Sequence, residues 1–329
     1  MTKGITQGYS PSGYVPGGLI PVNAGEAGDD LLDFVTRPDT RFGIGWSLDD
    51  SVGMVGTGEL ALLWARSGCG KSTWTLNVIR NTPEIPTIVF SMEMTPRRQL
   101  EWLTAMTFPL QTPGRDIEGV LREGPEDDRW QEVIDSVRQT RQVYSYLHFV
   151  NPSRPTVADF NVVVSDVEAM TGIRPQRVFI DHMTLMQGAN DYNGVLKTAA
   201  DLHSWAMAED LAVYCLQQTG RGGSDGDKGV RNDGHIPVTL SSGLYAGEHD
   251  ADWVFGMYRP DRHPKYKKRK EEFSRLTDFW SMNDEAKAVR GLVVFQVLKN
   301  RPYGETLEAG IELLYHPHSR TYTELGSEE

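Results

Sequence analysis

Short apolar runs alternate with longer amphipathic stretches from residue 43 onward. The short runs are typical of buried strands, and the longer stretches repeat their apolar positions with the period of a helix. This alternation predicts an α/β fold, a mostly parallel twisted sheet with helices on both faces. The predicted strands are 60–65, 87–90, 144–150, 178–180, 212–216, 253–258 and 292–298, with 306–315 forming a C-terminal β-hairpin with the last, and the predicted helices are 73–80, 97–108, 126–142, 157–170 and 196–210.

The N-terminal residues 1–40 do not share this pattern. We interpret them as a flexible arm, because residues 1–28 are rich in glycine and proline and poor in large apolar side chains. Residues 29–37 predict a short helix with acidic residues first and a basic residue last, which suits the helix dipole. This helix either packs on its own domain or is a linker helix that docks on a neighbouring subunit. Residues 41–329 then form the main domain, with a charged insertion at 259–290.

The composition indicates a globular chain, because 39% of the residues are hydrophobic and 24% are charged. No apolar run approaches the roughly 20 residues that a membrane span needs, so no membrane partner is expected. Only two cysteines occur, and Cys69 lies in a glycine-rich loop, so we expect no structural disulfide and a reducing, cytoplasmic setting. The net charge of −12 argues against a protein that coats DNA with its whole surface, but it allows a local basic channel.

Residues 65–73, Ala-Arg-Ser-Gly-Cys-Gly-Lys-Ser-Thr, follow a predicted strand and precede a predicted helix. This context distinguishes a phosphate-binding loop from a chance glycine-rich turn. Gly68 and Gly70 let backbone amides turn toward phosphate oxygens, and the helix N-terminus adds partial positive charge. Lys71 would reach the β- and γ-phosphates, and the Ser72 hydroxyl would ligate Mg²⁺. The predicted ATP-binding residues are Ser67, Gly68, Cys69, Gly70, Lys71, Ser72 and Thr73.

Hydrolysis also needs a carboxylate for the metal and a group that activates water. Asp181 ends an apolar strand, as the metal-holding carboxylate of such enzymes does. Glu93 follows the strand after the phosphate-loop helix, and the carboxyl ends of parallel strands face the nucleotide. We therefore predict that Glu93 is the general base. The alternative is an acidic residue at a helix start, beside Thr95 and Pro96.

Five segments, in order, resemble the DnaB-type replicative helicase family. Ser-Met-Glu-Met-Thr at 91–95 is similar to the family's Ser-Leu-Glu-Met, and Ile-Asp-His-Met-Thr-Leu-Met at 180–186 is similar to Ile-Asp-Tyr-Leu-Gln-Leu-Met. The segment 213–221 resembles the strand that ends in Ser-Gln-Leu-Asn-Arg. Glu-His-Asp-Ala-Asp at 248–252 is similar to Glu-Gln-Asp-Ala-Asp, and Lys-Asn-Arg-Pro-Tyr-Gly at 299–304 to Lys-Gln-Arg-Asn-Gly-Pro-x-Gly.

The resemblance covers the family's RecA-like P-loop ATPase domain, from about residue 43 to 324, and not its helical N-terminal domain. It is typical of a stand-alone form such as phages carry, which would act in the host cytoplasm. It implies that Gln218 senses the γ-phosphate, although a polar cap at a strand end is the alternative. It also implies that Lys299 and Arg301 reach a neighbouring subunit's nucleotide in a hexameric ring. A basic turn is the alternative for this pair.

The resemblance further implies that loops at about 187–196 and 221–247 line a DNA channel. The candidate contacts there are Arg221, Lys228, Arg231 and Gly243. Leu-Ser-Ser-Gly at 240–243 departs from the family's Leu-Arg-Glu-Ser-Gly and loses the charged pair beside the glycine. The separate basic run at 265–270 suits a single strand or a duplex flank, or it is a solvated loop. Its candidate contacts are Lys267, Lys268 and Arg269.

The leading hypothesis is an ATP- and Mg²⁺-dependent helicase ring on single-stranded or forked DNA, which works with replication or recombination proteins. A RecA-like recombination or annealing ATPase shares the core motifs, but the Lys-x-Arg at 299–301 favours the helicase. A metal-dependent DNA-structure nuclease is a further alternative, because Glu248, His249, Asp250 and Asp252 are residues that bind divalent metals. The strand before Gln218 argues against a helicase loader.

Overall fold

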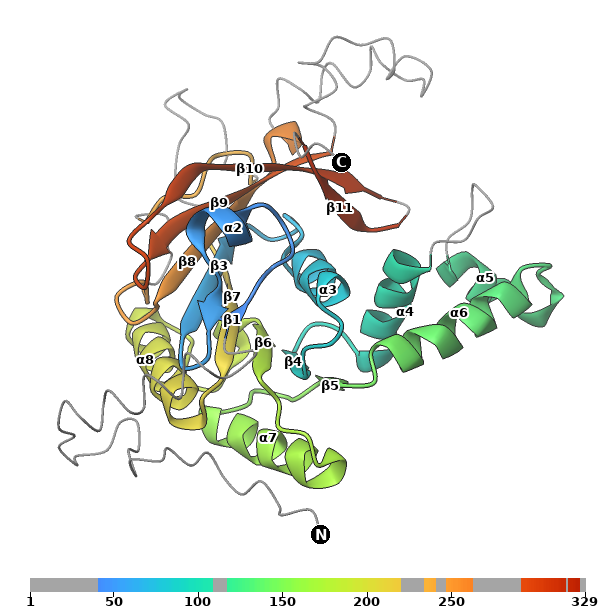
Figure 1. Cartoon of the computed structure of the whole chain (residues 1–329), viewed down its shortest axis with the longest axis horizontal. Coiled ribbons are helices and arrows are strands. Elements are labelled where there is room, and N and C mark those ends of the chain that lie inside the picture. Colours follow the sequence, from blue (N-terminus) through green and yellow to red (C-terminus); the bar gives the residue numbers. More distant parts are fainter. Residues whose placement is uncertain are drawn as a thin grey trace.

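A nine-stranded sheet runs through the computed structural model (Figure 1), which describes residues 41–108, 117–219, 234–240, 247–262, 291–317 and 319–325. Its strand order is β11-β10-β9-β8-β3-β7-β6-β4-β5. The strands from β8 to β5 are parallel, and β9, β10 and β11 are antiparallel to their neighbours. The bounds are β3 Leu60–Ala65, β4 Thr87–Ser91, β5 Leu147–Val150, β6 Arg177–Asp181, β7 Ala212–Gln218, β8 Trp253–Tyr258, β9 Leu292–Asn300, β10 Leu307–His316 and β11 Thr321–Glu324.

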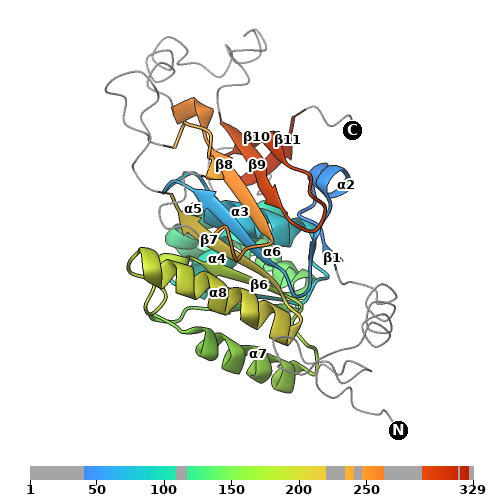
Figure 2. The ribbon, with the colours of Figure 1, turned by 90° about the vertical axis from the view of Figure 1, so that its left-hand side faces the viewer.

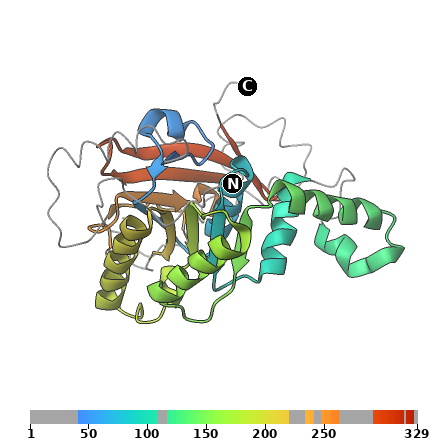
Figure 3. The same cartoon turned by 60° about the horizontal axis from the view of Figure 1, so that its bottom comes forward.

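Helices cover both faces of the sheet. Figure 2 shows α7 and α8 together on one face, and Figure 3 shows α5 and α6 projecting beyond the sheet. The predicted α/β fold with a mostly parallel sheet and a C-terminal hairpin is therefore confirmed. The helix bounds are α2 Leu48–Val52, α3 Lys71–Asn81, α4 Pro96–Thr107, α5 Ile117–Glu123, α6 Trp130–Val143, α7 Val157–Thr171 and α8 Tyr192–Glu209. The remaining elements are the short pair β1 Arg41–Phe42 and β2 Val55–Gly56, and the 3₁₀ turns η1 Gly124–Glu126, η2 Met183–Leu185 and η4 Pro260–Arg262.

Two helix starts differ most from the sequence prediction, and a local side-chain hydrogen bond accompanies each. The helix expected from residue 126 begins at Trp130, since Asp127 accepts hydrogen bonds from the Arg129 backbone (2.9 Å) and guanidinium and holds a turn there. The helix expected from residue 196 begins at Tyr192, because the Asp191 side chain accepts a hydrogen bond from the Gly194 amide (2.8 Å). The Asp191 side chain thereby supplies a partner for one of the unpaired amides in the first turn of α8.

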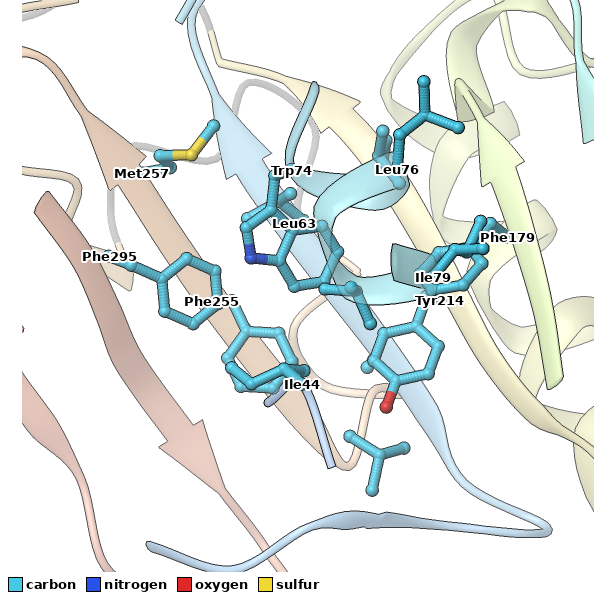
Figure 4. Close-up of a cluster of buried hydrophobic side chains, with 14 of the residues drawn as sticks. Ile44, Leu63, Trp74, Leu76, Ile79, Phe179, Tyr214, Phe255, Met257 and Phe295 are labelled. Atoms are coloured by element: carbon cyan, nitrogen blue, oxygen red, sulfur yellow. The ribbon is translucent and has the colours of Figure 1, made fainter. Parts of the chain in front are cut away.

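Aromatic side chains fill the core between α3 and the sheet (Figure 4). Trp74, in the first turn of α3, is fully buried, and its ring stacks on Phe295 with centroids 5.4 Å apart. The rings of Phe179, Tyr214 and Phe255 surround it at 6.2–6.4 Å. The start of α3 is thereby fixed against three of the parallel strands and β9. The opposite face of the sheet packs against α7 and α8 through a second apolar cluster.

Several predicted features lie outside the described residues. They are the arm with its 29–37 helix and most of the charged insertion, from residue 263 to 290. In the part of the chain that is described, no helix is long and apolar enough to cross a membrane.

Candidate active site

The loop between β3 and α3 has the backbone conformation that its glycines suggest. Gly68 and Gly70 have φ angles of +73° and +104°, a region that residues with a side chain rarely adopt. A Cβ atom at Gly70 would also collide with the Tyr322 hydroxyl of β11. The Lys71 ammonium is buried and donates to the Ala65 carbonyl (3.3 Å) across this loop. Burial lowers the pKa of Lys71, with the Asp181 carboxylate opposing that shift, so this amine gains from an anionic ligand.

Asp181 and Ser72 form the second part of the site. The Ser72 hydroxyl donates to Asp181 Oδ2 at 2.5 Å, while Oδ1 is buried with no hydrogen-bond partner among the described residues. Burial raises the pKa of Asp181, against the opposing effects of the Ser72 hydrogen bond and the Lys71 charge. A carboxylate oxygen with no partner beside a hydroxyl oxygen is a donor set that fits Mg²⁺, which prefers hard oxygen ligands. A cation here would give the charge of Asp181 a partner.

Glu93 and Gln218 lie at the same edge of the sheet as the phosphate loop. Ser91 of β4 pairs with Asp181 of β6, and Gln218 of β7 pairs with Ala65 of β3. The adjacent strands β3, β7, β6 and β4 therefore present their carboxyl ends side by side, as the sequence analysis expected for this edge. The structure thus brings Glu93, Gln218, Asp181 and the loop together.

His182 is a buried member of this group that the sequence analysis missed. Its Nε2 atom lies 3.2 Å from Glu93 Oε1 and 3.3 Å from Gln218 Nε2. The hydrogen bond from His182 is the main reason why the pKa of Glu93 is lowered, against an opposing effect of burial. A signal existed in the sequence, because histidine stands where the quoted family segment has tyrosine.

Two arginines, Arg66 within the phosphate loop and Arg262 outside it, connect the loop to distant segments, and the sequence analysis assigned neither a role. Arg66 donates to the Thr219 carbonyl (3.0 Å) directly after β7. Arg262, on η4, donates to the carbonyls of Ser67 (3.2 Å) and Gly68 (2.6 Å). No local motif could indicate these contacts, because they join the loop to residues far along the chain. The loop is thereby connected to the segments that precede residues 220–233 and 263–290.

Cys69, within the loop, is buried, and its thiol contacts the Gly234 carbonyl (3.6 Å). Burial raises the pKa of this thiol, so it stays protonated at neutral pH. Cys69 and Cys215 are both free and buried.

Lys299 and Arg301 lie at the opposite edge of the sheet from the phosphate loop. Lys299 of β9 pairs with Val254 of β8, near the start of that strand. Arg301 follows β9 and donates its backbone amide to the Asp252 carbonyl (2.8 Å), and the Asp252 amide in turn donates to the carbonyl of Leu60, the first residue of β3. At about 3.3 Å per residue, the five steps along β3 from Leu60 to Ala65 put roughly 16 Å between this level and the loop.

The two basic side chains have different surroundings. The Lys299 ammonium donates to the carbonyls of Glu248 and Ala251, the latter at 2.7 Å. The Arg301 side chain is 63% exposed and lies 3.7 Å from Asp252. Lys299 is therefore engaged by its own chain, and Arg301 is largely open to solvent.

The acidic segment 248–252 does not form a metal centre in the structure. Asp252 Oδ2 accepts a hydrogen bond from the Leu60 amide (3.0 Å) and lies 3.2 Å from His203 Nε2, so this oxygen is directed into the fold. His249 is 83% exposed. Across the described ranges, no group of three or more histidine, cysteine, aspartate or glutamate residues could hold a metal ion. The nuclease alternative therefore has no metal site in this part of the chain.

The predicted DNA contacts fall outside the described residues. They are Arg221, Lys228, Arg231, Gly243, Lys267, Lys268 and Arg269.

Comparison with known proteins agrees with this architecture. A sequence model of the DnaB-like helicase C-terminal domain matches residues 44–306. The structure is similar to a solved, separate ATPase domain, with a TM-score of 0.67 and 17% identity over 93% of this chain and 100% of that one. It is also similar to a DnaB-like replicative helicase studied with its primase interactions, with a TM-score of 0.68 and 17% identity over 92% of this chain and 68% of that one. No curated protein matches the chain.

Proposed function

This chain belongs to the DnaB-like helicase family and is an ATP-hydrolysing enzyme of the helicase type, and from that premise we propose that it is a DNA motor that hydrolyses ATP between neighbouring subunits of a ring. One observation carries the proposal. The phosphate loop, Asp181, Glu93 and Gln218 gather at the carboxyl edge of the sheet, while Arg301 projects from the opposite edge. Because one chain keeps its phosphate loop and Arg301 apart, a second chain would have to supply the arginine that completes each site.

In this proposal the described side chains divide the work of phosphoryl transfer. The loop amides and Lys71 bind the phosphates, and Ser72 and Asp181 hold Mg²⁺, which supplies positive charge to the phosphate oxygens. Glu93 accepts the proton of the attacking water. Its lowered pKa keeps the carboxylate ionised across the neutral range, which is the form that can accept a proton. Gln218, at the end of β7, senses the γ-phosphate with its amide.

The two basic residues at 299–301 then have separate roles. Arg301 reaches the γ-phosphate of the neighbouring subunit, where an arginine supplied in trans is worth about 10³–10⁵ in rate. Lys299 stays with the carbonyls of residues 248 and 251 and supports the turn beside the interface. This division refines the expectation that both residues reach across.

We further propose that the segments after β6 and β7 meet single-stranded or forked DNA inside a hexameric ring, with Arg221, Lys228, Arg231 and Gly243 as contacts. The run that contains Lys267, Lys268 and Arg269 would bind DNA outside this channel. Residues 1–40 would act as an arm with a linker helix, ahead of the ATPase domain at 41–329. The solved DnaB-like replicative helicase is described with a primase, which supports a replication protein as a partner. The motor would act in the cytoplasm, which would be the host cytoplasm if a phage encodes the chain.

Strand separation and ATP turnover test the proposal together. The wild-type chain and a Lys71→Ala variant are assayed with a forked DNA substrate and with poly(dT), each with ATP and Mg²⁺. We expect unwinding and DNA-stimulated hydrolysis by the wild type only. Electron microscopy with a non-hydrolysable ATP analogue shows whether rings form. ATP hydrolysis that persists without unwinding in every oligomeric state would refute the motor, and filaments on DNA would favour the recombination ATPase.

A further inference from the structure

The imidazole of His182 lies between the proposed base and the proposed sensor, and the proposed function gives it no role. The side chain is buried, with 4% of the residue exposed. Its Nε2 atom is 3.2 Å from Glu93 Oε1 and 3.3 Å from Gln218 Nε2. The other ring nitrogen, Nδ1, is 2.8 Å from the Thr184 hydroxyl oxygen. One ring atom therefore has two polar partners, one at the end of β7 and the other two residues after the end of β4.

These two partners require opposite states of Nε2. An ionised carboxylate only accepts hydrogen bonds, so Glu93 needs a hydrogen on Nε2. The Gln218 amide nitrogen only donates, so it needs a lone pair on the same atom. A single ring nitrogen supplies one of these at a time. The lowered pKa of Glu93 keeps its carboxylate ionised, so this glutamate does not become a donor itself.

The Thr184 hydroxyl makes both arrangements possible. A hydroxyl both donates and accepts, so it satisfies Nδ1 whether or not that atom carries the hydrogen. The two arrangements differ only in the ring nitrogen that carries the hydrogen. The buried ring is therefore satisfied either with Glu93 or with Gln218 as the partner of Nε2.

We propose that His182 is a positioning residue that holds either Glu93 or Gln218, but not both, and so couples the base to the glutamine at the end of β7. This inference rests on the proposed function, since it assigns hydrolysis to Glu93. A hydrogen bond from Nε2 restrains the carboxylate and lowers its basicity. When Gln218 takes Nε2, Glu93 is released toward the attacking water.

The position of Gln218 suggests what determines whether His182 binds Glu93 or Gln218. Gln218 is the last residue of β7, and the segment proposed to meet DNA follows directly after it. Its neighbour Thr219 is tied to Arg66 of the phosphate loop. A displacement at the end of β7 would therefore move Gln218 relative to His182. In this account, DNA accelerates hydrolysis because it favours the arrangement in which Glu93 is free.

Two substitutions at one position separate coupling from packing. His182→Leu removes the bonds to both partners, so Glu93 is permanently released. The rate without DNA should then rise about tenfold, the size of one lost hydrogen bond to a charged group. The ratio of the rate with DNA to the rate without DNA should fall close to one. His182→Gln restores an N–H donor for Glu93, so the rate without DNA should return to within about threefold of wild type.

The measurement is ATP turnover with Mg²⁺, with and without poly(dT), for the wild type and both variants. Melting temperature and the affinity for a fluorescent ADP analogue are measured beside it. If leucine lowers both rates in parallel and leaves their ratio unchanged, His182 is only a packing residue and the inference is overturned. Wild-type turnover that poly(dT) leaves unchanged contradicts the proposed function itself, and the coupling with it.

Thr184→Val carries the test if the leucine variant does not fold. Without the hydroxyl, Nδ1 loses its partner in both arrangements, but an unpaired N–H costs more than an unpaired ring lone pair, and the N–H stands at Nδ1 only in the arrangement that binds Gln218. The DNA-stimulated rate should therefore fall several-fold more than the rate without DNA. Equal effects on the two rates, or a larger effect without DNA, would overturn the coupling.

Discussion

The indole of Trp74 allows a prediction in which two opposing effects can be weighed. The side chain has no exposed surface, and four aromatic rings lie within 6.4 Å of it. A buried tryptophan removes about 200 Å² from water, which at about 25 cal/mol per Å² is worth about 5 kcal/mol. Trp74→Ala should therefore lower the free energy of unfolding by about 3–5 kcal/mol, in the usual range for such truncations.

Trp74→Phe should behave very differently. The smaller ring loses about 1 kcal/mol of apolar burial. However, Trp74 Nε1 is buried with no hydrogen-bond partner among the described residues. An unpaired buried N–H costs about 1–3 kcal/mol, and phenylalanine removes it. The two effects offset each other, so the phenylalanine variant should stay within about 1 kcal/mol of wild type.

Urea denaturation followed by far-ultraviolet circular dichroism measures both variants against wild type, at a concentration where the chain is monomeric. The affinity for ATP is measured in parallel, since Trp74 stands in the first turn of α3, three residues after Lys71. The phenylalanine variant should bind ATP normally. The reasoning is wrong if phenylalanine costs as much as alanine, or if alanine costs less than about 2 kcal/mol.

Three further predictions concern the active site. Glu93→Gln should lower ATP turnover by about 10²-fold or more and retain ATP binding, and turnover near the wild-type rate would exclude Glu93 as the base. Arg301→Ala should lower turnover of the assembled protein by about 10³-fold; mixing it with Lys71→Ala chains should restore activity, and no recovery would contradict a finger in trans. Asp181→Asn should abolish Mg²⁺-dependent hydrolysis and raise the melting temperature without nucleotide at neutral pH. Folding raises the pKa of Asp181, so the wild type loses stability as pH rises through the folded-state pKa of this carboxyl group. The gain in melting temperature from asparagine should therefore shrink at acid pH. A variant that melts below the wild type at neutral pH would refute this account of Asp181.

What the sequence predicts here is mainly local. The run before Ala65 and the glycines after it predict a strand and a loop without knowledge of any distant residue. The position of Asp181 and Glu93 at one edge also follows, because parallel strands share their carboxyl ends. The bridge through His182 does not follow, since it requires β7, β6 and β4 to be neighbours in that order. Strand order is a property of the whole chain.

Contacts between distant segments are the other features that the sequence does not predict. The resemblance predicts that Lys299 reaches a neighbouring chain, and its ammonium is bound by carbonyls some fifty residues earlier. Arg262 lies within the predicted charged insertion and holds a loop nearly two hundred residues earlier. Neither contact has a periodic or spaced pattern in the sequence. Each depends on how η4 and the end of β9 are placed by the finished sheet.

The separation of the phosphate loop from Arg301 has a consequence for how catalytic capacity scales with assembly. A contact that joins two different edges is heterologous, so each added subunit leaves one edge free until the chain of subunits closes. If Arg301 completes the neighbouring site, as proposed above, an open row of n subunits holds n − 1 complete sites, and a closed ring holds n. Activity per subunit would be almost zero at high dilution, would rise with every addition and would increase once more at closure. In such an assembly, the ATP turnover per subunit would show whether the ring is closed.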